Sequence, residues 1–166
     1  GILGLTHDHI WGNLQELKSS PLGELVAAAD PNVPLLDKIK DEYGCPQVFT
    51  SYEAMLEQVA LDAVYVYADN ASGPDLVEMA AARGLHAMVE KPMAADLEGA
   101  DRMLAAARAA GTLLMINWPF LWWPGLQKAL AMAEAGEIGQ LFSVKYRAAH
   151  AGPKELGCSP YFYEWL

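Results

Sequence analysis

The chain has 166 residues, 53% of them hydrophobic, and a formal net charge of −10. This is about one domain's length with enough apolar residues for a buried core. The acidic balance argues against nucleic acid and anionic membrane surfaces as partners, because both require a basic face. No apolar run is long enough to span a bilayer. The two cysteines, Cys45 and Cys158, leave one disulfide open as an alternative, but we expect a reduced, cytoplasmic protein.

A short apolar strand, a tight turn and a helix open the chain. The strand ends at Gly4, and apolar residues then recur at helical spacing, at Ile10, Leu14 and Leu17. A dinucleotide-binding turn would read Gly-x-Gly-x-x-Gly here, and only Gly4 fits, since Thr6 and His9 occupy the other two glycine positions. Thr6 can still offer its hydroxyl and amide, and the helix N-terminus favours an anion such as pyrophosphate.

Two histidines in this turn raise the question of a metal. His7 and His9 flank Asp8, but the sequence offers no third ligand beside them. A His-x-His turn without one is more often a helix start than a metal site. We therefore expect no bound metal.

The next strand, predicted over residues 24–30, ends in an acid. A carboxylate at Asp30 can accept both ribose hydroxyls of an adenosine and would repel a 2′-phosphate, which favours NAD over NADP. The alternative is that Asp30 caps a turn before Pro31. The two roles are compatible.

Strands and helices keep alternating as far as Asn117. We predict strands at 48–49, 63–68, 86–90 and 113–117. We predict helices at 33–43, after a Thr50–Glu53 capping box, at 74–83, and after an Asp96 cap with Leu97, Ala100, Leu104 and Ala107 on one face. Strict alternation with short loops is typical of an α/β fold with a doubly wound parallel sheet.

Polar residues follow two of these strands at the edge where such sheets bind ligands. Asp69 and Asn70 follow one strand, and Glu90-Lys91-Pro92 follows the next. Pro92 ends strand pairing and biases Lys91 toward an extended conformation, so that Lys91 holds a defined direction. The alternative is a solvated surface salt bridge.

The pattern changes after Asn117. An aromatic segment, 118–123, precedes a predicted helix at 125–135 and a segment, 141–149, with the alternation of a half-buried strand. The predicted inward-facing residues of the helix are Leu126, Ala129, Leu130 and Ala133. We therefore divide the chain into a dinucleotide-binding Rossmann domain, 1–118, and the beginning of an α+β domain with an open antiparallel sheet, 119–166. This second domain is incomplete and ends in an aromatic run, 161–166, so we expect the chain to be part of a longer protein.

Four segments together resemble the Gfo/Idh/MocA family of NAD(P)-dependent oxidoreductases. They are the opening strand 1–4, the Ala-rich strand that ends at Asp30, the segment 84–94 around Glu90-Lys91-Pro92, and the Gly-Glu-Ile-Gly run 136–139. The segment 84–94 is the most specific of the four. The resemblance covers essentially the whole chain.

The resemblance implies hydride transfer between a nicotinamide and a sugar-, polyol- or cyclitol-like hydroxyl or carbonyl. It implies Lys91 as the catalytic residue, and a homodimer or homotetramer built on the C-terminal sheet. The cofactor-binding residues that it implies are Gly4, Leu5, Thr6, His7, His9, Asp30, Asp69, Asn70, Glu90 and Lys91. The residues beside the small-molecule substrate would be Asn117 and Trp118.

Two other functions stay open on the same fold. The glycine-poor turn is compatible with a non-catalytic dinucleotide-binding sensor or regulatory protein. It is also compatible with a small-molecule-binding or structural domain that has lost the cofactor.

Overall fold

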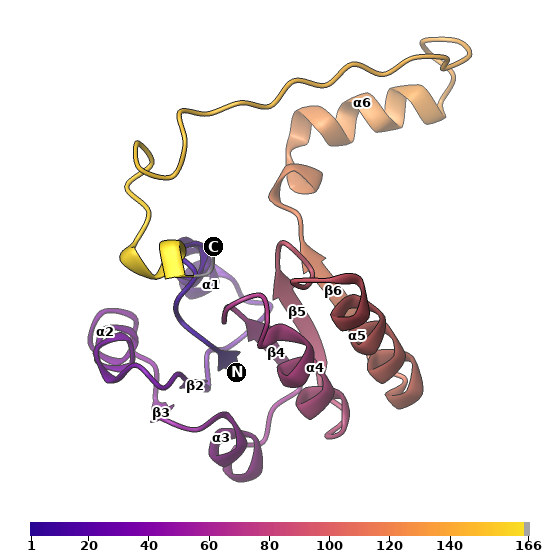
Figure 1. Ribbon diagram of the computed structural model, residues 1–166. Coiled ribbons are helices and arrows are strands. Elements are labelled where there is room, and N and C mark those ends of the chain that lie inside the picture. The colour runs from indigo at the N-terminus through magenta and orange to yellow at the C-terminus, as the bar shows by residue number, and fades with distance from the viewer. Residues whose placement is uncertain (165–166) are drawn as a thin grey trace. The chain divides into compact units, whose positions relative to one another are not determined.

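The computed structural model describes residues 1–164, and Figure 1 shows strands and helices alternating along the first two thirds of the chain. The elements are β1 (Ile2–Leu3), α1 (His9–Ser19), β2 (Ala27–Ala29), α2 (Val33–Tyr43), β3 (Gln47–Phe49), α3 (Tyr52–Gln58), β4 (Ala63–Val66), α4 (Gly73–Ala81), β5 (His86–Glu90), α5 (Leu97–Ala110) and β6 (Leu114–Asn117). Two compact units are present, one of residues 1–117 with 159–164 and one of residues 118–158. Trp165 and Leu166, the end of the aromatic run, lie outside the described residues.

The first unit is a parallel sheet in the order β3-β2-β1-β4-β5-β6. β1 lies between β2 and β4, with Ile2 opposite Ala28 on one side and Tyr65 on the other. This order is that of a doubly wound Rossmann sheet, and it places a switch point between β1 and β4. The predicted fold is confirmed.

Helices cover both faces of the sheet, so the strands are apolar at consecutive positions. Leu3 packs into a core with residues of α3, α4 and α5, including Met55, Val77 and Met103. Ile2 packs into a second core with residues of α1 and α2. The two cores together fix the carboxyl ends of the strands.

Local signals predicted several boundaries and missed others. α2 has the predicted bounds, and Gly44 ends it with φ +72°. β2 is shorter than the predicted strand, because residues 24–26 lie outside the ladder. The N-cap of α3 is Ser51 rather than Thr50, since the Ser51 hydroxyl accepts the Ala54 N–H.

The buried face of α5 differs from the prediction in part, since Ala107 is buried as predicted but the two leucines are not. Leu97 is 85% exposed and Leu104 is 38% exposed, whereas Met103 is fully buried. Gly99 sets this orientation, because a Cβ at Gly99 would lie 2.9 Å from the ring of Pro74 on α4. Close contact between α4 and α5 at a glycine therefore decides which face is buried.

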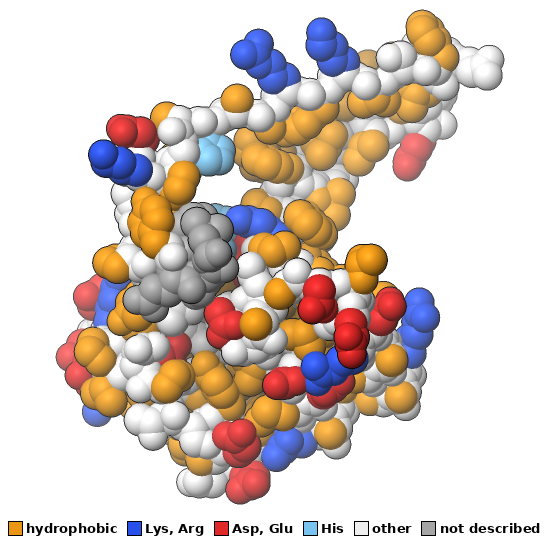
Figure 2. Space-filling view, viewed as in Figure 1, with side chains coloured by type: hydrophobic (Ala, Val, Ile, Leu, Met, Phe, Trp, Pro, Cys, Tyr) orange, Lys and Arg blue, Asp and Glu red, His pale blue; other side chains and the backbone are white. Residues whose placement is uncertain are grey.

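The second unit holds the 3₁₀ helix η1 (Pro119–Trp122) and α6 (Pro124–Glu134). α6 buries no residue, so its predicted inward face, Leu126, Ala129, Leu130 and Ala133, is wrong for the described chain. The predicted strand 141–149 is also wrong, because a strand needs a neighbour and the described part of this unit offers none. Figure 2 shows exposed hydrophobic side chains in the second unit. Trp118, Phe120, Trp122 and Trp123 are among the exposed residues of this unit.

The assignment of 119–166 to a substrate and oligomerisation domain stays a prediction. The short 3₁₀ helix η2 (Pro160–Glu164) belongs to the first unit. In the part of the chain that the structure describes, no helix has both the length and the hydropathy needed to cross a bilayer.

Candidate functional site

The first turn of the sheet depends on one glycine. Gly4 has φ +85°, a conformation that side chains disfavour, and a Cβ there would lie 2.4 Å from the backbone nitrogen of Ala68. Its amide donates to the Ala29 carbonyl at 2.9 Å. Gly4 therefore lets the turn between β1 and α1 pass close to the end of β4.

The amides of this turn donate within the protein. The Leu5 N–H donates to Asp30 Oδ2 at 2.6 Å, and the His7 N–H donates to the Tyr67 carbonyl at 3.2 Å. The Thr6 hydroxyl donates to the same carbonyl at 3.3 Å. A turn with Thr6 in place of glycine is thus tied to the ends of β2 and β4.

Asp30 has the turn-capping role that the sequence left open. The residue is only 1% exposed, and its Oδ1 accepts both the backbone and the side-chain N–H of Asn32, each at 2.7 Å. With Leu5 on Oδ2, the carboxylate joins the first turn to the start of α2. Three N–H donors of the protein therefore orient this carboxylate.

A pocket of about 290 Å³ opens beside Asp30. It is lined by Thr6, Asp30, Pro31, Asn32, Tyr52, Ala68, Asp69 and Tyr161. Two of these residues are carboxylates, and none of the lining residues in the described chain is Lys, Arg or His. Burial raises the pKa of Tyr52, and the charges of Asp30 and Asp69 raise it further, which reflects a negative potential in this pocket.

Asp69 is held by the loop that leads into α4. Its Oδ1 accepts the Ser72 amide at 2.9 Å and its Oδ2 accepts the Ser72 hydroxyl at 2.6 Å. This fixes the second carboxylate on the opposite side of the switch point from Asp30.

The Glu90-Lys91-Pro92 segment lies farther along the same edge, where β5 ends. Glu90 is 4% exposed, and its Oε2 accepts the side-chain N–H of Asn117, its register partner on β6, at 2.8 Å. Its Oε1 lies 3.0 Å from His9 Nδ1 at the start of α1. Burial raises the pKa of Glu90, but the hydrogen bonds from His9 and Asn117 outweigh it and leave the pKa below its ordinary value.

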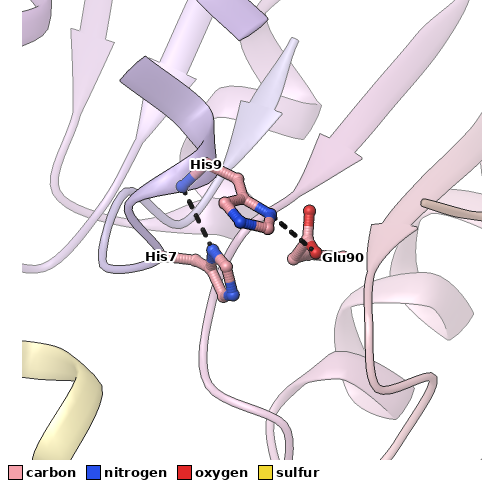
Figure 3. Close-up of side chains that lie close together, drawn as sticks. All are labelled: His7, His9 and Glu90. Carbon is pink, nitrogen blue, oxygen red and sulfur yellow. Dashed lines mark hydrogen bonds and ion pairs between the residues drawn. The ribbon is translucent and has the colours of Figure 1, made fainter. Parts of the chain in front are cut away.

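His7 completes this group, as Figure 3 shows. Its side chain is buried, and its Nδ1 accepts the His9 amide at 3.2 Å. Burial lowers the pKa of His7 to about 4, an effect that the Glu90 charge opposes and the charges of His9 and Lys91 increase. His7 is therefore a neutral imidazole at pH 7.

The structure brings most of the predicted residues to one sheet edge but not to one point. Thr6, Asp30 and Asp69 line the first pocket. His7, His9 and Glu90 form a separate group, with Asn117 hydrogen-bonded to Glu90. Lys91 and Asn70 follow β5 and β4 and are partly exposed. Trp118 belongs to the second unit and is 51% exposed.

Sequence reasoning missed several residues of this edge. Asn32 and Tyr52 line the pocket, and the Asp-Pro-Asn run could have suggested Asn32. The contact of His9 with Glu90 joins residues 81 positions apart, at the start of α1 and the end of β5, so it left no local signal.

The chain is similar in sequence to known oxidoreductases. Residues 1–118 match the family model described as an oxidoreductase family with an NAD-binding Rossmann fold. The chain is 33% identical, over 86% of its length, to a dTDP-3,4-didehydro-2,6-dideoxy-alpha-D-glucose 3-reductase of Actinomadura kijaniata, of which it covers 43%. It is 32% identical, over 87% of its length, to D-xylose 1-dehydrogenase (NADP(+)) 2 of Haloferax volcanii, of which it covers 44%.

Solved structures give the same result. An oxidoreductase from Agrobacterium radiobacter, in complex with NAD+, L-tartaric acid and magnesium, matches with a TM-score of 0.79 and 26% identity over 84% of this chain and 40% of that one. The 3-ketoreductase KijD10 from Actinomadura kijaniata, in complex with TDP-benzene and NADP, matches with a TM-score of 0.72 and 32% identity over 82% of this chain and 43% of that one. The chain thus spans less than half the length of these relatives.

Proposed function

Because the chain belongs to the Gfo/Idh/MocA family of oxidoreductases, we propose that its protein transfers a hydride between a nicotinamide cofactor and a sugar-, polyol- or cyclitol-like hydroxyl or carbonyl. The observation that carries this proposal is the Glu90-Lys91-Pro92 segment at the carboxyl edge of an NAD-binding Rossmann sheet. The names of the relatives, a deoxysugar reductase and a xylose dehydrogenase, support a sugar-like substrate.

NAD is the preferred cofactor in this proposal. The adenosine ribose would occupy the pocket between Asp30 and Asp69, two carboxylates that favour hydroxyl donors and repel a 2′-phosphate. The pocket lining includes no cation to pair with such a phosphate. The relatives include NADP enzymes, so the preference rests on this chain's own residues.

Lys91 acts on the substrate oxygen. When bound, the nicotinamide supplies the hydride chemistry at the reacting carbon. The amino group of Lys91 holds the oxygen on that carbon by a hydrogen bond and exchanges the proton that this oxygen gains or loses. Glu90, fixed by His9 and Asn117, holds the end of β5 from which Lys91 extends.

Replacement of this lysine tests the proposal. Lys91→Ala should abolish turnover across a panel of sugars and cyclitols while NAD affinity changes little, because the cofactor is held mainly by the turn, Asp30 and Asp69. Lys40→Ala, which removes an exposed lysine of α2, is the matched control and should keep full turnover. Wild-type turnover by Lys91→Ala would refute the role of Lys91.

A non-catalytic dinucleotide sensor is the second candidate. The amides of Leu5 and His7, which donate inside the protein, favour it because they leave the turn less adapted to a pyrophosphate. This candidate predicts NAD binding without reduction of NAD by any member of the panel. Homodimer or homotetramer formation is part of the proposal for either candidate.

A further inference from the structure

Three potential metal ligands meet at the end of β5. His7 and His9 come from the first turn and the start of α1, and Glu90 comes from the last position of β5. One donor atom from each lies within 4.8 Å of the other two. The side chains converge in Figure 3, so the third ligand that the sequence did not offer is supplied by the fold.

We propose that His7, His9 and Glu90 bind one divalent transition-metal ion, with Zn²⁺ and Co²⁺ as the cations of best fit. Two imidazoles and one carboxylate are a common three-ligand set for Zn²⁺ and leave a fourth position open. Imidazole donors select such ions over Mg²⁺ and Ca²⁺, which prefer oxygen ligands throughout.

The distances fit such an ion after a small adjustment. Tetrahedral bonds of about 2.1 Å place neighbouring donors about 3.4 Å apart. His9 Nδ1 and Glu90 Oε1 are already 3.0 Å apart. The His9 side chain is 43% exposed, so its ring has room to turn and close the wider gaps. Neutral His7 has one acceptor nitrogen, which accepts the His9 amide, so His7 binds the ion in exchange for this hydrogen bond.

The surroundings of Glu90 also suit a ligand. Asn117 donates to the carboxylate oxygen that does not face His9, and so orients the other oxygen toward the histidines. Such a second hydrogen bond is the usual support of a metal-binding carboxylate. Glu90 is almost fully buried, and a divalent cation would compensate its charge more completely than one imidazole does.

Metal titration of the full chain without cofactor tests the proposal. Isothermal calorimetry should give one equivalent of Zn²⁺, and Co²⁺ should show visible d–d absorption bands of a nitrogen-containing, low-coordinate site. His9→Gln and Glu90→Gln should each weaken binding by more than about 100-fold, since each removes a ligand. His86→Gln and His150→Gln, which remove the chain's other two histidines, are the matched controls and should bind as the wild type does.

A second measurement needs no variant. In wild-type protein, Co²⁺ should broaden or shift the imidazole NMR signals of His7 and His9 and leave those of His86 and His150 sharp. Absence of Zn²⁺ and Co²⁺ binding, unchanged binding by both ligand variants, or equal broadening of all four histidines would overturn the proposal and leave His9 and Glu90 as a hydrogen-bonded pair only. Neither measurement involves turnover, so its result is independent of the proposed oxidoreductase activity.

Discussion

Single residues decide where two backbone segments can pass close together at this sheet edge, and Gly4 is the clearest case. Its positive φ and the nearness of Ala68 both exclude a side chain. Gly12 offers the opposite situation, because it lies in α1 and, apart from its chain neighbours and the nearby helix backbone, no described atom lies within 4 Å of the place of a Cβ.

Gly4→Ala should therefore lower the free energy of unfolding by about 2–4 kcal/mol, through backbone strain and a clash. Gly12→Ala should raise it by about 0.5–1 kcal/mol, since alanine favours the helix. Urea denaturation followed by circular dichroism measures both. Equal effects of the two variants would contradict the described turn.

The buried imidazole of His7 leads to a prediction about how stability depends on pH. Its folded-state pKa of about 4 lies below the ordinary value of 6.5, so the unfolded chain binds this proton more readily. Its contribution is therefore fully present above pH 6.5 and is lost as the pH falls toward 4. The loss amounts to about 3 kcal/mol at most.

Denaturant unfolding at a series of pH values, with a chelator present, checks this expectation. His7→Gln should flatten the fall in stability between pH 6.5 and 4, whereas His150→Gln should keep the wild-type slope because His150 is exposed. An unchanged slope in His7→Gln would show that His7 does not titrate as described.

At the scale of elements, the sequence predicts type and order well because each strand here is a short apolar run between turn signals. α2 and β5 have the predicted bounds. The buried face of a helix is predicted less well, because it depends on the element against which the helix packs. Ala-rich α5 could bury either of two stripes, and its contact with α4 through Gly99 selects the one with Met103.

Substitutions on α5 separate the two stripes. Met103→Ala should lower the free energy of unfolding by about 2–4 kcal/mol, since it leaves a cavity in the core. Leu104→Ala should lower it by less than about 1 kcal/mol, because Leu104 is partly exposed. Thermal or urea unfolding measures both losses of stability. A larger loss for Leu104→Ala than for Met103→Ala would support the buried face that the sequence predicted.

At the scale of the molecule, alternation of strands and helices was sufficient to predict the Rossmann sheet and its ligand edge. The residues on that edge were mostly predicted from their positions after strands, as Asp30, Asp69 and Glu90 illustrate. The hydrogen-bond partners of these residues were not predicted, because the contacts of Glu90 with His9 and Asn117 join segments that are distant in the sequence. The strand predicted at 141–149 is wrong for a similar reason. A strand forms only beside a neighbouring strand, and the described chain contains none for this segment.

The central claim is that this edge binds NAD through the pocket between Asp30 and Asp69. Calorimetric titration of the protein with NAD and, separately, with NADP tests it most directly. We predict that NAD binds and that NADP binds at least about tenfold more weakly, because the 2′-phosphate meets two carboxylates and no cation. Binding of neither nucleotide, or NADP affinity equal to or above that of NAD, would contradict the account.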